Sequence, residues 1–332
     1  MKSPAKAKKG QKPLTCIEIC AGAGGQALGL EMAGFSALAH VELDRHACAT
    51  LRLNRPKWNV IEENIRDFHA DEFAGVDLLA GGVPCPPFSK AGKQLGSSDE
   101  RDLFPEAIRL VRECQPKAVM LENVRGLLDA VFFDYRRNLK KQLEDLGYLA
   151  DWHLLNASDF GVPQLRPRVV VVAIRKDLAS RFQPPMQLTD GVLPKTVGDT
   201  LVDLMAENGW EGAFQWAARA NEIAPTLVGG SKKHGGADLG PTRAKRAWAA
   251  LGVNAKSLAN EAPFPGFSEM PRLTIRMTAR IQGFPDDWQF AGGKTSAYRQ
   301  IGNAFPPPVA RAVAKRIAIA IGDQKVKGMK AS

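Results

Sequence analysis

The sequence predicts an α/β fold with a parallel, doubly wound sheet and a smaller second domain. Three observations predict it: five short apolar runs are typical of buried strands, helical patterns separate most of them, and residues 180–290 lose this alternation. Alternating strands and helices are typical of parallel sheets that helices cover on both faces. At 332 residues the chain is also long enough for two domains.

The expected strands are apolar runs of four to six residues, at 15–19, 37–41, 76–80, 118–121 and 169–174. Helical patterns lie over 26–32 and 105–113, and we expect the first of these helices to end at Gly34. In sheets of this class, ligands bind beyond the carboxyl ends of the strands. The residues that follow each strand are therefore the candidates for chemistry.

Positive charge is concentrated at the two ends of the chain. Of the net charge of +10, residues 1–13 contribute five lysines without an acid, and residues 323–332 contribute three lysines against one acid, Asp323. We expect both tails to be solvated and disordered, with a salt-sensitive attraction to phosphates as the functional alternative. The charge alone does not establish a nucleic-acid partner.

The composition predicts an intracellular protein. No apolar run reaches the ~18 residues that would span a bilayer, and the N-terminus lacks the apolar segment of a signal peptide. Five cysteines, an odd number without a Cys-x-x-Cys pair, indicate neither a disulfide framework nor a zinc site. We therefore expect cysteine thiols and no bound metal.

A glycine loop follows the first expected strand, and an acid follows the second. Gly22, Gly24 and Gly25 precede a helix, where backbone N–H groups suit a carboxylate or a phosphate. Glu42 is placed to accept hydrogen bonds from two ribose hydroxyls. NAD, FAD and S-adenosylmethionine all fit this pattern, but the glycines are too tightly clustered for the dinucleotide motif Gly-x-Gly-x-x-Gly. The pattern therefore favours an adenosine cofactor with an anionic tail over a dinucleotide.

Cys85 follows the third expected strand and lies between two prolines. A thiolate at the ligand-binding edge of a sheet can act as a nucleophile. Cys16, Cys48 and Cys114 instead fall in apolar or helical patterns and are expected to be small buried side chains. Cys20 lies in the glycine loop and is expected to be at most a ligand contact.

One acid and two arginines complete a set that suits cytosine. Attack of a thiolate on carbon 6 of cytosine makes carbon 5 nucleophilic, and Glu122, after the fourth strand, could contact ring N3 and the exocyclic amine. Arg166 and Arg168 project on the same side if their segment is extended, and could orient Glu122 and hold the base carbonyl oxygen. The alternatives are an ion-paired or surface carboxylate, and arginines that face phosphates or solvent.

These residues lie in ordered motifs that resemble those of the DNA (cytosine-5) methyltransferases. The motifs are Ala-Gly-x-Gly-Gly at 21–25, Pro-Cys at 84–85, Glu-Asn-Val at 122–124, Gln-x-Arg-x-Arg at 164–168, Arg-Leu-Thr at 272–274 with Gln-Gly-Phe-Pro at 282–285, and Gln-Ile-Gly-Asn-Ala at 300–304. Together they extend over nearly the whole chain. Six motifs in order are far more specific than any one of them.

The resemblance implies an enzyme that transfers the methyl group of S-adenosylmethionine to carbon 5 of a cytosine flipped out of a specific duplex DNA site. By resemblance, Cys85 is the nucleophile, Glu122 is the base-binding acid, Arg166 holds that glutamate, and Arg168 contacts the cytosine carbonyl. The fold it implies is the Rossmann-like fold of S-adenosylmethionine-dependent methyltransferases.

The motifs also assign a set of cofactor residues, which comprises Cys20, Ala21, Gly22, Gly24, Gly25, Glu42, Leu43, Asn64, Ile65, Pro84, Leu103, Asn303 and Ala304. Three positions depart from the family pattern. Cys20 replaces an aromatic that often covers the adenine, Asn64 replaces the usual aspartate at the adenine edge, and Pro86 follows the nucleophile where glutamine is frequent. We expect weaker cofactor binding and a stiffer loop, with the core chemistry intact.

The resemblance divides the chain into a basic disordered tail (1–13), a catalytic and cofactor-binding domain (14–180), a target-recognition domain (181–290), a return to the catalytic domain (291–322) and a second tail (323–332). It also implies that residues 89–102 close over the flipped base.

Expected DNA contacts are Ser89 and Lys93 in this loop, Lys232, Lys233 and Arg243 in a basic cluster at 231–246, and Arg272. A solvated loop is the alternative for the cluster, and His234 is expected to be an ordinary histidine rather than a metal ligand. Arg272 and Thr274 could instead brace the two domains. The recognised DNA sequence cannot be derived from these side chains.

The expected partner is double-stranded DNA, with no membrane, and the expected state is a monomer in the cytoplasm, associated with the nucleoid. The enzyme would act either in a restriction-modification system, beside a separate cognate endonuclease, or as an orphan methylase. The alternative hypotheses are an RNA cytosine-5 methyltransferase and a DNA-binding regulator without catalytic turnover. An amino-directed methyltransferase would place Asp or Asn where Cys85 precedes Pro86-Pro87-Phe88.

Overall fold

The computed structural model describes residues 12–84, 102–185, 195–230 and 236–322. Seven strands form one sheet in the order β3-β2-β1-β4-β5-β7-β6. Their bounds are β1 (Leu14–Ile19), β2 (Phe35–Glu42), β3 (Val60–Glu62), β4 (Leu78–Gly81), β5 (Ala118–Val124), β6 (Tyr148–Asn156) and β7 (Pro167–Arg175). All five expected strands are present, and β3 and β6 are two edge strands that the apolar runs did not indicate.

The sheet is mixed rather than wholly parallel, which corrects the expectation for the last predicted strand. Strands β3, β2, β1, β4 and β5 pair in parallel, whereas β7 pairs antiparallel with both β5 and β6. The beginning of β7 therefore lies beside the end of β5, with Val124 opposite Arg168. This antiparallel direction places the residues that precede β7 close to the residues that follow β5.

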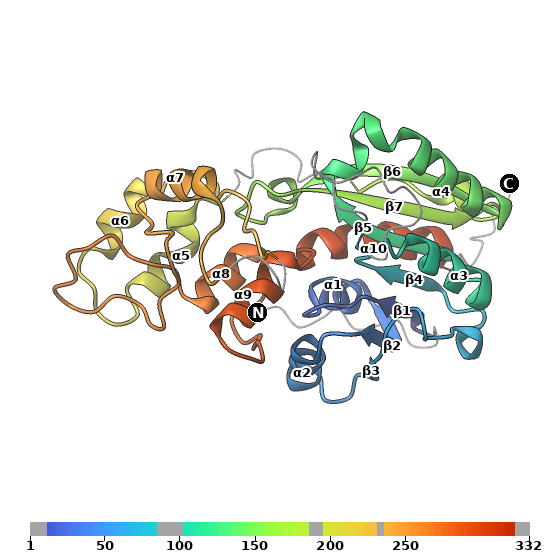
Figure 1. Cartoon of the computed structure of the whole chain (residues 1–332), viewed down its shortest axis with the longest axis horizontal. Helices are drawn as coiled ribbons and strands as arrows, with labels where there is room; N and C mark the ends of the chain where they lie inside the picture. Colours follow the sequence, from blue (N-terminus) through green and yellow to red (C-terminus); the bar gives the residue numbers. More distant parts are fainter. Residues whose placement is uncertain (1–11, 85–101, 186–194, 231–235, 323–332) are drawn as a thin grey trace, which may run out of the picture.

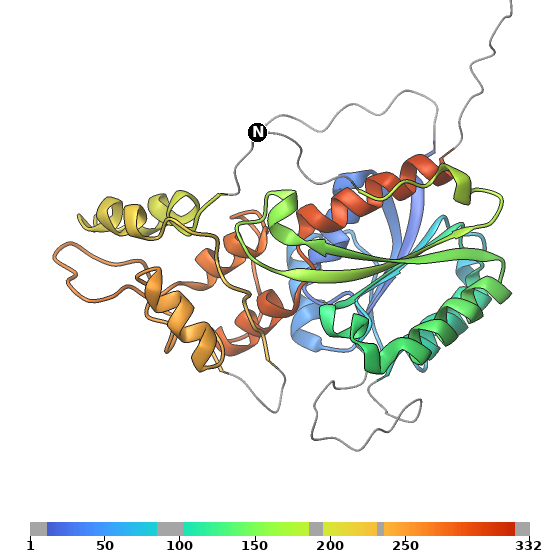
Figure 2. The same cartoon turned by 90° about the horizontal axis from the view of Figure 1, so that it is seen from above.

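Helices cover both faces of the sheet (Figure 2). They are α1 (Gly25–Ala33), α2 (Arg45–Asn54), α3 (Phe104–Cys114), α4 (Phe133–Asp145) and α10 (Pro307–Ile321). Alternate residues of each strand point to opposite faces, so Leu78 packs in one core with α1 and α10, and Leu79 packs in another with α3 and α4. The doubly wound architecture is confirmed, and α1 ends at Gly34, whose φ of 96° suits a helix C-cap.

A smaller lobe lies beside the sheet (Figure 1). It contains α5 (Val197–Met205), α6 (Ala213–Arg219), α7 (Thr242–Ala250), α8 (Ile275–Gln282) and α9 (Lys294–Asn303) around one apolar core. Tyr298 and Ile301 of α9 belong to this core, whereas α10 packs on α1, where Gly29 lies against Ala310. Within the expected return segment 291–322, α10 is therefore the part that packs on the sheet.

In the described part of the chain, no helix is long and apolar enough to cross a membrane.

Candidate active site

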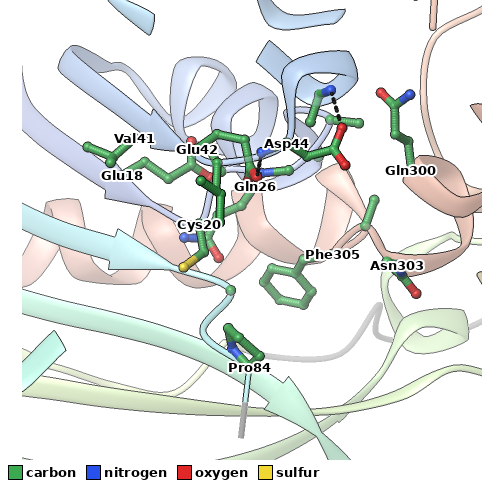
Figure 3. A pocket seen from close by; sticks show the side chains of 18 of the residues that line it. Glu18, Cys20, Gln26, Val41, Glu42, Asp44, Pro84, Gln300, Asn303 and Phe305 are labelled. Carbon is green, nitrogen blue, oxygen red and sulfur yellow. Dashed lines mark hydrogen bonds between the residues drawn. The ribbon is translucent and has the colours of Figure 1, made fainter. Parts of the chain in front are cut away.

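A cavity of about 380 Å³ opens beyond the carboxyl ends of β1, β2 and β4 (Figure 3). Twelve of the thirteen expected cofactor residues line it, namely Cys20, Ala21, Gly22, Gly25, Glu42, Leu43, Asn64, Ile65, Pro84, Leu103, Asn303 and Ala304. The exception, Gly24, is the N-cap of α1, where a Cβ would lie 2.7 Å from Leu51 Cδ2. Segments from both ends of the chain thus meet at one cavity, and the cofactor roles of these residues remain predictions.

The glycine loop bends tightly into α1 because its backbone needs glycine. Gly22 and Gly24 have φ values of 55° and 86°, a region that other residues rarely adopt. A Cβ on Gly25 would lie 2.3 Å from the carbonyl oxygen of Phe305. The loop therefore places backbone N–H groups at the N-terminus of α1 directly on the cavity, where they suit an anionic group.

Glu42, at the end of β2, accepts hydrogen bonds from the backbone of two residues that also line the cavity. Its Oε2 accepts a hydrogen bond from Gly22 N at 2.7 Å, and its Oε1 accepts one from Asp44 N at 2.7 Å. Each carboxylate oxygen can accept a second hydrogen bond. Glu42 is thus oriented with acceptor capacity left over, which fits the two adjacent hydroxyls of a ribose.

Two side chains in the cavity wall were missed by the sequence reasoning. Glu18, in β1, and Gln26, in the first turn of α1, are only 0% and 4% exposed. Glu18 Oε2 lies 2.8 Å from His40 Nδ1, but Glu18 Oε1 and both amide atoms of Gln26 have no hydrogen-bond partner in the described part of the chain. Burial raises the pKa of the Glu18 carboxyl, against the opposing effect of its hydrogen bond with His40.

Buried polar atoms are nearly always hydrogen-bonded, so these free atoms call for a ligand. A carboxylate oxygen suits an ammonium group, and an amide together with a helix N-terminus suits a carboxylate. With Glu42 on the ribose side, the residues present therefore fit the amino-acid and nucleoside parts of S-adenosylmethionine. Nothing in the sequence pattern distinguished Glu18 from a strand residue or Gln26 from a helix residue.

Glu122 and Arg168 form a buried ion pair at the edge of the same cavity. Arg168 Nε lies 2.8 Å from Glu122 Oε1, with side-chain exposures of 11% and 10%. Burial raises the pKa of the Glu122 carboxyl, while the charges of Arg168 and Arg166 oppose this effect. The antiparallel direction of β7 explains the pair, because it returns Arg168 to the end of β5.

Among the described residues Arg166 makes no hydrogen bond with Glu122, although its charge lowers the pKa of that carboxyl, so its role in holding Glu122 stays a prediction. Its guanidinium is fully buried and donates to the carbonyl oxygens of Leu227 at 2.8 Å, Gly302 at 2.6 Å and Ala304 at 3.2 Å. Arg168 makes the direct ion pair with the glutamate. The two arginines point to different partners because Arg166 lies before β7, between the sheet and the smaller lobe.

Cys85 lies outside the described residues, but the residues just before it are placed. Pro84 lines the cavity together with Glu122, and Asn123 Nδ2 donates to the carbonyl oxygen of Val83 at 2.8 Å. The end of β5 is thereby tied to the segment that leads to the expected nucleophile.

Each of the other four cysteines has a thiol whose pKa is raised by burial. For Cys48 and Cys114 the pKa rises to about 12, and burial also raises the pKa of Cys16 and Cys20. A thiolate is therefore disfavoured at all four positions.

Four of the expected DNA contacts, Ser89, Lys93, Lys232 and Lys233, lie outside the described residues, as does His234. Arg243, on α7, and Arg272 are exposed, and neither lines the cavity. Thr274 caps α8 by accepting a hydrogen bond from Met277 N. In the basic cluster, Lys245 is paired with Asp238 at 2.9 Å.

A family model described as C-5 cytosine-specific DNA methylase matches residues 14–318. Among curated proteins, the type II methyltransferase M.NaeI of Lentzea aerocolonigenes is 60% identical over 93% of this chain and 75% of its own length. The type II methyltransferase M.NgoMIV of Neisseria gonorrhoeae is 58% identical over 91% of this chain and 96% of its own length.

Solved structures share the fold at much lower identity. The Dnmt2 methyltransferase of S. pombe superposes with a TM-score of 0.63 and 18% identity, covering 92% of this chain and 98% of its own. The methyltransferase EhMeth of Entamoeba histolytica gives a TM-score of 0.64 and 16% identity, covering 93% and 98%. The smaller lobe is thus included in the shared fold.

Proposed function

The chain belongs to the C-5 cytosine-specific DNA methylases and is a DNA cytosine-5 methyltransferase of the restriction-modification type; we propose that it methylates a flipped-out cytosine through a covalent bond from Cys85 to carbon 6. The cofactor we propose is S-adenosylmethionine, which supplies the methyl group when bound. Glu42 would hold its ribose, Glu18 its ammonium group, and Gln26 with the N-terminus of α1 its carboxylate.

The buried Glu122–Arg168 pair at the cavity edge is the observation that carries the proposal. A buried carboxyl whose pKa is raised can keep a proton that an exposed one would lose. Such a carboxyl can donate to ring N3 of cytosine as the ring gains electrons, and Arg168 fixes its orientation. Glu122 therefore meets the need for an acid beside the base.

The proposed reaction begins and ends with the Cys85 thiolate. The Cys85 thiolate adds to carbon 6, and Glu122 neutralises the charge that develops at N3. Once carbon 5 carries the methyl group that the bound cofactor would supply, N3 returns its proton to Glu122. Carbon 5 then loses its own proton to a base, and the electrons of that C–H bond expel the thiolate. The products are 5-methylcytosine, a proton, S-adenosylhomocysteine and the regenerated enzyme.

Cells that express the chain provide the test. We expect methylation sequencing of their DNA to find 5-methylcytosine at one short motif, and Cys85→Ser to abolish it. With purified protein and S-adenosylmethionine, a duplex that carries this motif with 5-fluorocytosine should give an adduct that survives denaturation, because carbon 5 then carries fluorine in place of the proton that must leave. Methylation by Cys85→Ser, or label from tritiated cofactor in tRNA alone, would contradict the proposal.

We also propose that the enzyme acts as a monomer on duplex DNA in the cytoplasm, on the nucleoid, and that a separate endonuclease recognises the same site. The high identity to two type II methyltransferases supports the pairing with an endonuclease. Protection of plasmid DNA against cleavage at the motif found by sequencing tests it.

A further inference from the structure

Glu18 and His40 form a buried pair at the wall of the cofactor cavity, and the catalytic scheme above gives His40 no role. Glu18, in β1, lines the cavity together with Glu42 (Figure 3). His40, in β2, is only 1% exposed. Glu18 Oε2 lies 2.8 Å from His40 Nδ1, while Glu18 Oε1 has no hydrogen-bond partner among the described residues. One oxygen of Glu18 is thus held by the protein, and the other is left free.

The surroundings of His40 indicate which of its nitrogens carries the proton. Nε2 is buried and has no hydrogen-bond partner in the part of the chain that the structure describes. A proton on Nε2 would therefore be a buried donor without an acceptor, whereas a proton on Nδ1 is donated to Glu18 Oε2. The Trp58 ring covers the imidazole, with 4.3 Å between the ring centroids. We therefore assign His40 as a donor to Glu18.

Burial favours a proton on Glu18. It raises the pKa of this carboxyl, the hydrogen bond from His40 opposes the rise, and the charge of Glu42 adds to it. Strand β4 places Ala80 opposite Glu18, and the buried residues of α1 include no ionisable side chain. Because Oε2 accepts from His40, the proton of the neutral carboxyl belongs on Oε1.

Other ionisable groups near the pair have less influence on Glu18 than His40 has. Burial raises the pKa of the Cys16 and Cys20 thiols, so both stay neutral at neutral pH. The Arg55 guanidinium lies 5.7 Å from the centroid of the Trp58 ring and pairs with Glu31. After burial itself, the hydrogen bond from His40 is the largest influence on the carboxyl. The remaining charged residues that line the cavity are Asp44, Glu63, Glu122 and Arg299.

We propose that Glu18 holds a proton on Oε1 in the cofactor-free protein and exchanges it for the ammonium group of S-adenosylmethionine, and that His40 sets the pH of this exchange. The proton passes to solvent, and the carboxylate that remains accepts a hydrogen bond from the ammonium group, so each cofactor bound releases one proton. By donating to Oε2, His40 stabilises the carboxylate and lowers the pH at which the proton leaves. His40 is a positioning residue, because it acts through Glu18.

This proposal rests on the proposed function, because it assumes the cofactor named there. Its test measures proton release by calorimetry in two buffers that differ in their enthalpy of ionisation, from about pH 5.5 to about pH 8. The ligand is S-adenosylhomocysteine, which has the ammonium group but no methyl group to transfer. The control ligand is 5′-methylthioadenosine, which keeps the adenine and the ribose and lacks the amino-acid part. Proton changes at Glu42 would therefore affect both ligands alike.

For the wild-type chain we expect S-adenosylhomocysteine to release about one proton at the acidic end of this range and almost none at the alkaline end. Over the pH range of release, its Kd should fall about tenfold for each unit of rising pH. The control ligand should release no proton and keep a constant Kd, because it has no ammonium group to replace the proton of Glu18.

His40→Asn and His40→Leu are a matched pair of variants. The two replacements have similar shapes and both remove the ring, but only asparagine can donate a hydrogen bond to Glu18 Oε2. We expect His40→Asn to release the proton over the same pH range as the wild-type chain. In His40→Leu the range should move up by about one pH unit or more, so affinity is lost at acidic pH and regained at alkaline pH. A purely structural role of His40 would weaken binding by the same factor at every pH in both variants.

Glu18→Gln keeps the proposal testable if His40→Leu fails to fold. It has no carboxyl proton to lose, so the release should disappear. His69→Gln is the control variant, because the side chain of His69 is 71% exposed and does not line the cavity, and it should behave as the wild-type chain does. Three results would overturn the proposal: no release from the wild-type chain at any pH, release that persists in Glu18→Gln, or the same pH range in His40→Asn and His40→Leu. A chain that binds neither ligand would contradict the proposed function instead.

Discussion

The cofactor cavity and a second cluster, where the sheet meets the smaller lobe, are both built from buried polar side chains, yet they differ in how far these side chains are hydrogen-bonded. The second cluster comprises Gln164, Arg166 and Gln282, and we call it the joint cluster. In the cavity, Glu18 Oε1 and both amide atoms of Gln26 have no partner among the described residues. In the joint, each amide of Gln164 and Gln282 is bonded within the protein, and of the Arg166 nitrogens only Nε has no partner in the described part of the chain. Free buried polar atoms destabilise a protein until a ligand meets them, whereas bonded ones hold its parts together. The first region is thus organised for binding and the second for placement.

The comparison predicts that substitutions in the cavity alter the reaction rate or the cofactor affinity. Substitutions in the joint should instead lower the free energy of unfolding. Glu122→Gln should have the largest effect. A neutral amide keeps the shape of the side chain but cannot transfer a proton to N3, so we expect kcat to fall at least about 100-fold. Filter-binding assays with tritiated cofactor measure the rate.

The control is the affinity for sinefungin, an unreactive analogue of S-adenosylmethionine, which should remain within about twofold because the proposed cofactor contacts are Glu42, Glu18 and Gln26, whereas Glu122 is assigned to the base. A kcat within about threefold of wild type would remove Glu122 from the mechanism.

Glu42→Gln should have the next largest effect, on cofactor affinity. An amide nitrogen cannot accept the hydrogen bond that Gly22 N or Asp44 N donates to the carboxylate, so one backbone donor loses its partner. Hydrogen bonds to charged groups contribute about 1.5–3 kcal/mol, so we expect the Kd for sinefungin to rise about tenfold or more and Tm to fall. Calorimetry and thermal unfolding measure the two effects. An unchanged Kd would exclude Glu42 as the ribose ligand.

The cavity and the joint also differ in how much of each the sequence revealed. Glu42 and Glu122 follow buried strands, and the rule that ligands bind at carboxyl strand ends found them without a structure. Glu18 was not predicted because it lies inside β1, where the alternation of side chains along a strand only assigns a residue to one face of the sheet. The joint was not predicted, although Gln164, Arg166 and Gln282 lie in motifs, because most of the groups that accept from them are backbone carbonyls, which no motif identifies.

The fold shows the same limit. Five strands were predicted because their apolar runs are buried on both faces, as in β7. The edge strand β6 was missed because Asp151 and His153 interrupt its apolar residues, so the sequence has no continuous apolar run there. The direction of β7 depends on the connection through residues 157–166 and not on composition, so the pairing of Arg168 with Glu122 required the structure.

Glu18→Gln should produce the smallest effect and reverse the sign of the stability change expected for Glu42→Gln. Burial raises the pKa of Glu18 above the ordinary value of 4.5, so the folded protein holds this proton more tightly than the unfolded chain. The carboxylate therefore reduces stability as the pH rises above 4.5, with the full reduction above the folded pKa. A glutamine avoids this penalty and can still bond to His40, so Tm of the cofactor-free protein should rise at pH 8.

The rise should shrink as the pH falls below the folded pKa of Glu18 and disappear below about 4.5, since the carboxyl is then protonated in the folded and the unfolded chain alike. Sinefungin affinity should fall at the same time, because an amide binds an ammonium group less strongly than a carboxylate does. If Tm of the Glu18→Gln variant is lower than that of the wild-type chain at pH 8, the Glu18 carboxylate stabilises the cofactor-free protein through its pairing with His40. Glu18 would then not be a group whose burial is unfavourable until a ligand binds. The cavity would then follow the same rule as the joint, and the contrast between the two regions would fail.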